Sequence, residues 1–170
     1  MYLDKATISI KAGNGGDGVV SFHREKYVAN GGPDGGDGGN GGSIIFVASD
    51  KMNTLNNFMY EKKFYAQNGE NGSSKLCFGK KGEDLRITVP CGTVIKDAET
   101  GKVLADMYAD GFEYTCLKGG RGGKGNAFFK SPTRQAPHFS QLGEQTKKYD
   151  VGRNHQLFRL VSAHRRLCVC

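Results

Sequence analysis

The fold of this chain is decided by the stretch Gly31-Gly32-Pro33-Asp34-Gly35-Gly36-Asp37-Gly38-Gly39-Asn40-Gly41-Gly42. Glycine pairs recur every third residue and leave Asp34, Asp37 and Asn40 as a third row. Three residues per turn is the period of polyproline II, a left-handed helix whose backbone makes no internal hydrogen bonds. With glycine on two faces, neighbouring segments can approach closely enough to exchange N–H to C=O hydrogen bonds. The spacing therefore predicts extended segments that lie side by side.

Two further stretches repeat this phasing. In Lys118-Gly119-Gly120-Arg121-Gly122-Gly123-Lys124-Gly125 the third row is Lys118, Arg121 and Lys124. In the shorter Gly13-Asn14-Gly15-Gly16-Asp17-Gly18 it is Asn14 and Asp17. One segment thus presents an acidic edge and another a basic edge. The two edges can pair with each other, or the basic edge can face a phosphate backbone.

Three other interpretations of the glycines compete with this one. A collagen triple helix needs an unbroken, proline-rich array, and the chain has only four prolines. A flexible linker is open to any glycine-rich sequence, but the regular phasing and the charged third row argue against it. Residues 13–18 also fit the G-x-G-x-x-G fingerprint of dinucleotide sites, which requires a helix to follow, whereas 19–22 has the pattern of a strand.

Strand patterns dominate the remainder of the chain up to residue 150. Apolar and polar residues alternate over 6–10, 85–89 and 112–116, and 44–47 is a short β-branched run. Val94-Ile95 and Val103-Leu104 flank the turn-like residues 97–101 and predict a hairpin. No segment shows three helical turns of apolar spacing. We therefore expect an all-β sandwich or barrel in one compact domain.

The cysteines and histidines do not indicate chemistry. Cys77, Cys91 and Cys116 lie in strand-like apolar stretches and are predicted to be buried small hydrophobic groups. No C-x-x-C pair occurs, and the four histidines have no Ser, Cys or carboxylate arrangement that would support catalysis. We predict no catalytic residue, no metal site and no cofactor in this chain.

Charge and hydropathy bear on the compartment. The formal net charge is +7, of which residues 151–170 contribute four arginines and no acid. No run approaches the roughly 18 apolar residues of a membrane span, and 1–11 lacks the features of a signal peptide. These observations favour a cytoplasmic protein without a membrane span.

Several motifs, in order along the chain, resemble the N-terminal domain of the Obg (CgtA) family of ribosome-associated GTPases. The resemblance begins at Ser21-Phe22-His23-Arg24-Glu25-Lys26-Tyr27-Val28 and runs directly into the glycine stretch from Gly31. It continues through Gly82-Glu83-Asp84-Leu85, Val89-Pro90-Cys91-Gly92-Thr93, Gly119 to Asn126 and Arg134-Gln135-Ala136-Pro137. It ends near Asp150 and Val151.

This resemblance implies a mainly β protein, with a jelly-roll-like β-barrel base that carries a bundle of glycine-rich polyproline II segments. It implies binding to the large (50S) ribosomal subunit during assembly, with 23S rRNA and ribosomal proteins as partners. The glycine-rich loops would contact rRNA near the peptidyl transferase centre, while a separate domain binds GTP and magnesium and hydrolyses the nucleotide. We expect a monomer.

The sequence departs from the family after residue 150. The family enters its GTPase domain there through a strand and a P-loop, whereas this chain reads Gly152-Arg153-Asn154-His155 and contains no G-x-x-x-x-G-K-[ST] loop. We therefore predict an Obg-type domain over 1–150 and a disordered or irregular basic tail over 151–170, and no GTPase activity in this chain.

Cations beside the glycine-rich stretches are the predicted rRNA contacts. They are Arg24, Lys26, Lys118, Arg121, Lys124, Lys130 and Arg134. Each could instead be a solvated charge or pair with Glu25, Asp34 or Asp37. Tyr27, Phe128, Phe129 and Phe139 could stack on bases, although burial against the barrel is favoured. The alternative function is a structural or protein-interaction domain whose acidic and basic edges neutralise each other.

Overall fold

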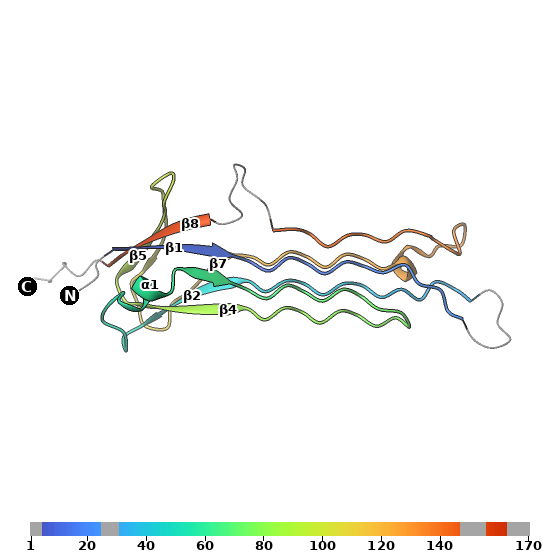
Figure 1. The fold of residues 1–170 in the computed structure, drawn as a ribbon, viewed down its shortest axis with the longest axis horizontal. Helices are drawn as coiled ribbons and strands as arrows, with labels where there is room; N and C mark the ends of the chain where they lie inside the picture. The colour runs from blue at the N-terminus through green and yellow to red at the C-terminus, as the bar shows by residue number, and fades with distance from the viewer. Residues whose placement is uncertain (1–4, 25–30, 147–155, 163–170) are drawn as a thin grey trace, which may run out of the picture.

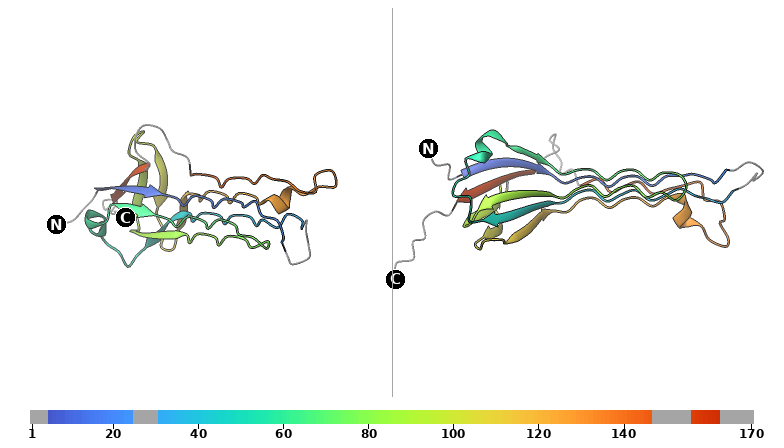
Figure 2. Two further views of the ribbon diagram at one scale, coloured as in Figure 1. Left: turned by 45° about the vertical axis from the view of Figure 1, so that its right-hand side comes forward. Right: turned by 90° about the horizontal axis from the view of Figure 1, so that it is seen from below.

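The computed structural model describes residues 5–24, 31–146 and 156–162, and within 156–162 it describes the side chains of Leu160 and Val161. The molecule is long and narrow, with β-sheets at one end and extended chain segments running side by side to the other (Figure 1; Figure 2). The two parts are called here the base and the bundle. The far end of the bundle, where the chain reverses direction, is called the tip.

The base contains a five-stranded and a three-stranded sheet among the described residues. The larger sheet has the order β3-β1-β8-β5-β6, and β1 pairs parallel with β3 and antiparallel with β8. Its strands are β1 (Lys5–Lys11), β3 (Lys63–Tyr65), β5 (Thr93–Asp97), β6 (Val103–Met107) and β8 (Gln156–Ser162). The smaller sheet has β2 (Ile44–Ser49) between β4 (Leu85–Pro90), which is parallel to it, and β7 (Glu113–Leu117), which is antiparallel.

The hydrophobic core of the base lies between these sheets. Ile8 and Ile95 of the larger sheet and Phe46 of the smaller sheet are fully buried in one cluster. The short helix α1 (Asn57–Tyr60) adds Phe58 to that cluster. The alternation seen in the sequence thus marks the inward-facing side of each strand. The mainly β prediction, the strands over 6–10, 44–47, 85–89 and 112–116 and the β5–β6 hairpin are confirmed. The strand pattern over 19–22 was misleading, because that segment has only one isolated bridge, between Phe22 and Pro33.

The prediction of an irregular tail is wrong for part of that tail. Residues 156–162 form β8, which inserts between β1 and β5 and pairs antiparallel with both. Leu160 is fully buried, and its backbone lies opposite Ala6 and Ile95. An edge strand with unpaired backbone groups accepts another strand readily. The predicted boundary at residue 150 falls outside the described residues.

The bundle confirms the period-three prediction. The amides of Gly13, Gly16 and Val19 donate to the carbonyls of Gly42, Gly39 and Gly36 at 2.9, 2.8 and 3.2 Å. From one hydrogen bond to the next, the donor residue lies three positions later in the chain and the acceptor residue lies three positions earlier. Further extended segments at 67–72, 79–83 and 141–146, which the sequence analysis did not identify, pack around this pair together with 118–125.

Close approach of backbones explains the glycines of the bundle. A Cβ atom on Gly38 would collide with the carbonyl of Gly16, and one on Gly122 would collide with the carbonyl of Gly38. Both neighbours are backbone atoms, and the carbonyl of Gly16 accepts the amide of Gly123 at 2.9 Å, so it cannot move aside without breaking that bond. The flexible-linker interpretation is therefore wrong for these segments, because each is held by regular hydrogen bonds to others.

The residues of the third row, like the glycines, hold the bundle together. The side-chain oxygens of Asp37 and Asn40 accept the amides of Gly125 and Gly122, both at 2.8 Å. Asp17 accepts the amide of Gly143 at 2.7 Å, and Asn14 accepts that of Thr146 at 3.1 Å. A lone polyproline II helix leaves its amides unpaired, so these short side chains supply acceptors that neighbouring backbone does not.

Candidate nucleic-acid interface

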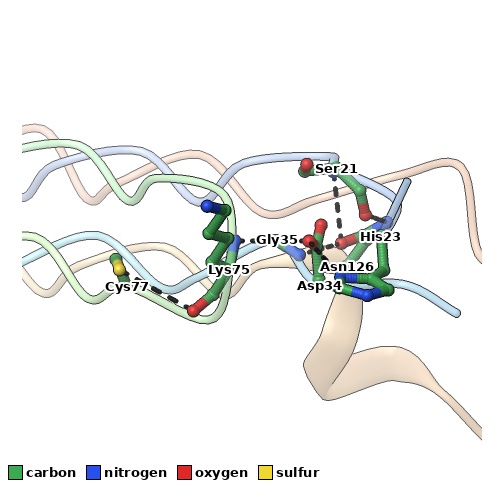
Figure 3. Close-up of polar contacts among 7 residues, drawn as sticks. All are labelled: Ser21, His23, Asp34, Gly35, Lys75, Cys77 and Asn126. Atoms are coloured by element: carbon green, nitrogen blue, oxygen red, sulfur yellow. Dashed lines mark hydrogen bonds and ion pairs between the residues drawn. The ribbon is translucent and has the colours of Figure 1, made fainter. Parts of the chain in front are cut away.

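One buried side chain, that of Asn126, holds the tip together. Its Oδ1 accepts the amide of Gly35 at 2.9 Å, and its Nδ2 donates to the carbonyl of Ser21 at 2.9 Å (Figure 3). Its Nδ2 also donates to the carbonyl of Pro137 at 3.2 Å. Asn126 is fully buried and begins the short 3-10 helix η1 (Asn126–Phe129). Loops that are far apart in sequence are thereby fixed to one another.

A second tip contact involves Asp34, which is 8% exposed. Its carbonyl accepts the amide of Leu76 at 2.7 Å, and its Oδ2 lies 3.3 Å from the amide of Lys75 and 3.9 Å from Nδ1 of His23. Lys75 and Leu76 have φ of 59° and 56° in the turn in the middle of the 73–78 loop. Left-handed backbone is costly for such residues, so Asp34 holds this turn in a strained conformation.

The cations of the 118–125 segment have different environments. Lys124 pairs with Asp37, the two charged groups being 2.7 Å apart, whereas Lys118 and Arg121 are exposed. One part of the basic edge therefore pairs with the acidic edge, and the other part faces solvent. Lys118 lies near the base, and Lys124 lies close to the tip.

Two more predicted contacts come from the loop after η1. In its turn at 131–134, the amide of Ser131 donates to the carbonyl of Arg134, and the amide of Arg134 donates to the carbonyl of Ser131. Lys130 and Arg134 are exposed, and Lys130 lines an open depression of about 740 Å³ whose other wall includes Gly31 and Gly32. Arg24 is exposed, while Lys26 and Tyr27 lie outside the described residues.

The predicted burial of the phenylalanines against the base is wrong. Phe128 is 63% exposed and Phe139 42% exposed. Both belong to the segment 126–140, which lies at the end of the bundle remote from the sheets (Figure 1). The apolar character of a residue favours burial only where the fold supplies a core, and the narrow bundle has glycine in its interior instead. Other exposed apolar residues at the same end are Val20, Leu76, Phe78 and Leu142.

The sequence analysis also missed a group of cations. Lys75 lies in the reversal between 67–72 and 79–83, Lys80 and Lys81 lie in 79–83 directly after it, and all three are exposed. Lys81 pairs with Asp84, with Nζ and Oδ2 3.1 Å apart. The signal was present in the sequence, since Gly69, Gly72, Gly79 and Gly82 keep the spacing of three and no acid occurs between residues 71 and 82.

The predicted burial of the cysteines is wrong for Cys77. Cys77 is exposed at the tip, because its apolar-looking neighbourhood is a turn rather than a strand. Cys116 lies on β7, and burial raises the pKa of its thiol to about 12. Burial also raises the pKa of the partly buried Cys91 thiol. Within the described ranges, no three His, Cys, Asp or Glu side chains gather as a metal ion would require.

In the described part of the chain, no helix has the length and apolar character needed to cross a bilayer. The fold and the exposed groups define a class of protein: a β base that projects a glycine-rich bundle, with cations and aromatic rings at its far end. The basic, acid-free stretch from Lys118 to Ser140 runs along one segment of that bundle and around its tip.

Comparison with known proteins agrees with this description. The family model GTP1/OBG matches residues 3–154, and the chain belongs to that family. It is 58% identical over 143 residues to the GTPase Obg of Clostridium novyi, covering 84% of this chain and 34% of that protein. It is 54% identical over 144 residues to the GTPase Obg of Acetivibrio thermocellus, covering 85% and 34%. The chain thus spans about a third of the length of the curated relatives it matches.

Proposed function

We propose that this chain is the ribosome-binding N-terminal module of an Obg-type GTPase that acts in assembly of the large ribosomal subunit. The tip of the bundle would contact rRNA near the peptidyl transferase centre. In this proposal the module recognises RNA by charge and shape, while GTP and magnesium are bound in the part of the relatives' length that this chain does not span. The residues here do not fit such a site, since the chain has no P-loop motif.

The charge distribution is the observation that carries the proposal. Between Lys118 and Ser140 the chain has five Lys and Arg and no Asp or Glu. Lys118, Arg121, Lys130 and Arg134 from this stretch are exposed. Phosphate contacts by such side chains release counterions and favour binding to RNA.

The construction of the bundle supports the same function. Backbone hydrogen bonds between its segments and the Asn126 contacts fix the tip loops before any partner binds. A surface that is ordered beforehand loses less conformational entropy on docking. A narrow projection with little side-chain bulk also suits entry into a confined RNA cavity.

Co-sedimentation with purified large ribosomal subunits at about 50 and 200 mM salt tests this function. We expect the chain to pellet with the subunits at low salt and much less at high salt. The double variant Lys118→Ala, Arg121→Ala should have a lower affinity for the large subunit. The magnitude of the slope of log affinity against log salt concentration should also fall by about one for each phosphate that the variant no longer neutralises. The control Lys51→Ala, Lys102→Ala removes the same charge from exposed positions of the base and should bind as the unmodified chain does.

A structural or protein-interaction domain is the second candidate, and one observation favours it. The Lys124–Asp37 pair shows that the basic and acidic edges do neutralise each other at one place. If that were the whole role of the edges, the folded chain would not pellet with subunits at either salt concentration. That result would refute the ribosome-binding proposal.

A further inference from the structure

We propose that Phe128, Phe129 and Phe139, flanked by Lys124 and Arg134, form a stacking site for unpaired bases of single-stranded RNA. These five residues are called the aromatic row. This inference rests on the proposed function and makes it more specific, because it assigns recognition of bases, and not only of phosphates, to one side of the tip.

The rings of the aromatic row contact one another in sequence. Phe128 and Phe129 meet edge to face, with centroids 5.4 Å apart and planes at 90°. Phe129 and Phe139 are 4.8 Å apart with planes at 42°. Phe129 is half-buried between two exposed rings, so it supports them and limits their rotation. The rings of Phe128 and Phe139 are therefore held in place while exposed to water, although burial of such large apolar groups would ordinarily be favourable.

A cation lies over one face of each outer ring. The ammonium of Lys124 is 5.1 Å from the centroid of Phe128, and the guanidinium of Arg134 is 5.4 Å from that of Phe139. Both distances are within the range of cation–π attraction. Lys124 is further restrained by Asp37, so its position does not depend on a ligand. Each ring thus has a positive group over one face, close enough to meet the phosphate of a nucleotide whose base stacks on the other face.

The chemistry around the row favours RNA over an acidic or apolar protein segment. A base has an apolar face and is linked to a phosphate, and stacking on aromatic side chains is sequence-tolerant for that reason. The open depression beside Lys130 adjoins the same loop and offers further room next to a positive charge. Duplex RNA keeps its bases stacked internally, so only unpaired nucleotides can reach the rings.

The test compares a fluorescently labelled 12-nucleotide single-stranded RNA with an abasic strand of the same length and charge. Fluorescence anisotropy measures affinity, and a 2-aminopurine base placed mid-strand reports stacking by quenching. We expect the unmodified chain to bind the base-bearing strand at least about fivefold more tightly than the abasic strand, with quenching of 2-aminopurine.

The variants separate stacking from charge. Phe128→Ala with Phe139→Ala should remove the preference for bases and the quenching while leaving salt-dependent binding of the abasic strand. Phe128→Leu with Phe139→Leu keeps apolar bulk and should lose the quenching too, which also covers the case in which the alanine variant fails to fold. Tyr60→Ala, at a position of the base that is 90% exposed, is the control and should change nothing.

The possible failures are distinguishable. Equal, salt-dependent binding of both strands would overturn the stacking site and leave the phosphate-based function intact. A base preference that persists in both Phe variants would place stacking elsewhere and also overturn it. Binding of neither strand, by a chain that also fails to pellet with large subunits, would overturn both proposals.

Discussion

The carboxylate of Asp37 contacts two parts of the neighbouring segment at once. Its Oδ2 lies 2.7 Å from Nζ of Lys124, and its Oδ1 accepts the amide of Gly125 at 2.8 Å. One side chain therefore fixes the register between 35–42 and 118–125, in addition to neutralising a cation. The hydrogen bond to the amide and the ion pair have separate effects, and substitutions can distinguish them.

We expect Asp37→Asn to cost about 1 kcal/mol or less of unfolding free energy, because the pair is partly exposed and the amide oxygen still accepts from Gly125. Asp37→Ala should cost about 1–3 kcal/mol, since it leaves a buried amide unpaired. Urea unfolding followed by circular dichroism measures both. Equal losses of stability for the two variants would mean that the charge, and not the acceptor, is the important part.

Two glycines of the same motif should respond differently to substitution. Gly38→Ala places a Cβ against the carbonyl of Gly16, so we expect a loss of about 1–3 kcal/mol or more. At Gly32 the nearest described atom to an added Cβ is the flexible ammonium of Lys130, at 3.6 Å, so Gly32→Ala should be nearly neutral. Thermal unfolding of the two variants checks this. Comparable midpoints would contradict the close-packing account of the bundle.

Asp84 should contribute a pH-dependent part of the stability. The amide of Ser43, at 2.7 Å from Oδ1, and the nearby Lys81 hold the pKa of Asp84 below its ordinary value. A depressed folded-state pKa stabilises the fold above the unfolded value of about 3.9 and loses that effect as pH falls through the folded value.

The measurement is urea unfolding of Asp84→Asn and the unmodified chain between pH 7 and pH 2. We expect the variant to be less stable by under about 1 kcal/mol at neutral pH, with a difference that shrinks in acid. Asp106→Asn, at an exposed position of β6, is the matched control. A difference that grows as pH falls would have the wrong sign for this mechanism.

Thiol reactivity should separate two cysteines. The raised pKa of Cys116, about 12, leaves its thiol protonated at neutral pH, and burial restricts access. Cys77 is exposed at the tip. In a background with Cys168 and Cys170 replaced by serine, iodoacetamide should modify Cys77 at least about 100-fold faster than Cys116. Peptide mapping by mass spectrometry at short times measures this, and early modification of Cys116 would show that β7 opens readily.

The glycine spacing could be interpreted from the sequence alone, whereas the exposure of single side chains could not. The spacing of Gly13, Gly16, Gly36 and Gly39 predicted hydrogen-bonded extended segments, and the structure has them. The same logic applied to Gly69 and Gly72 would have found another segment, so that omission was avoidable. The exposure of Phe128 could not be predicted from the glycine spacing. Whether a phenylalanine is buried depends on what surrounds it in the fold, and the surroundings of Phe128 contain glycine and solvent rather than a hydrophobic core.

Sequence patterns alone predicted the two kinds of building element: alternation that makes strands, and a glycine period of three that makes close-packed extended segments. Both are local properties, set by backbone geometry and by which side chains a repeat leaves room for. Only the tertiary structure decided that Lys124 meets Asp37 while Lys118 and Arg121 face solvent, that Cys77 is exposed, and that β8 enters the larger sheet. Lys124 and Asp37 are 87 residues apart, and such contacts depend on the order and register in which distant segments return to one another.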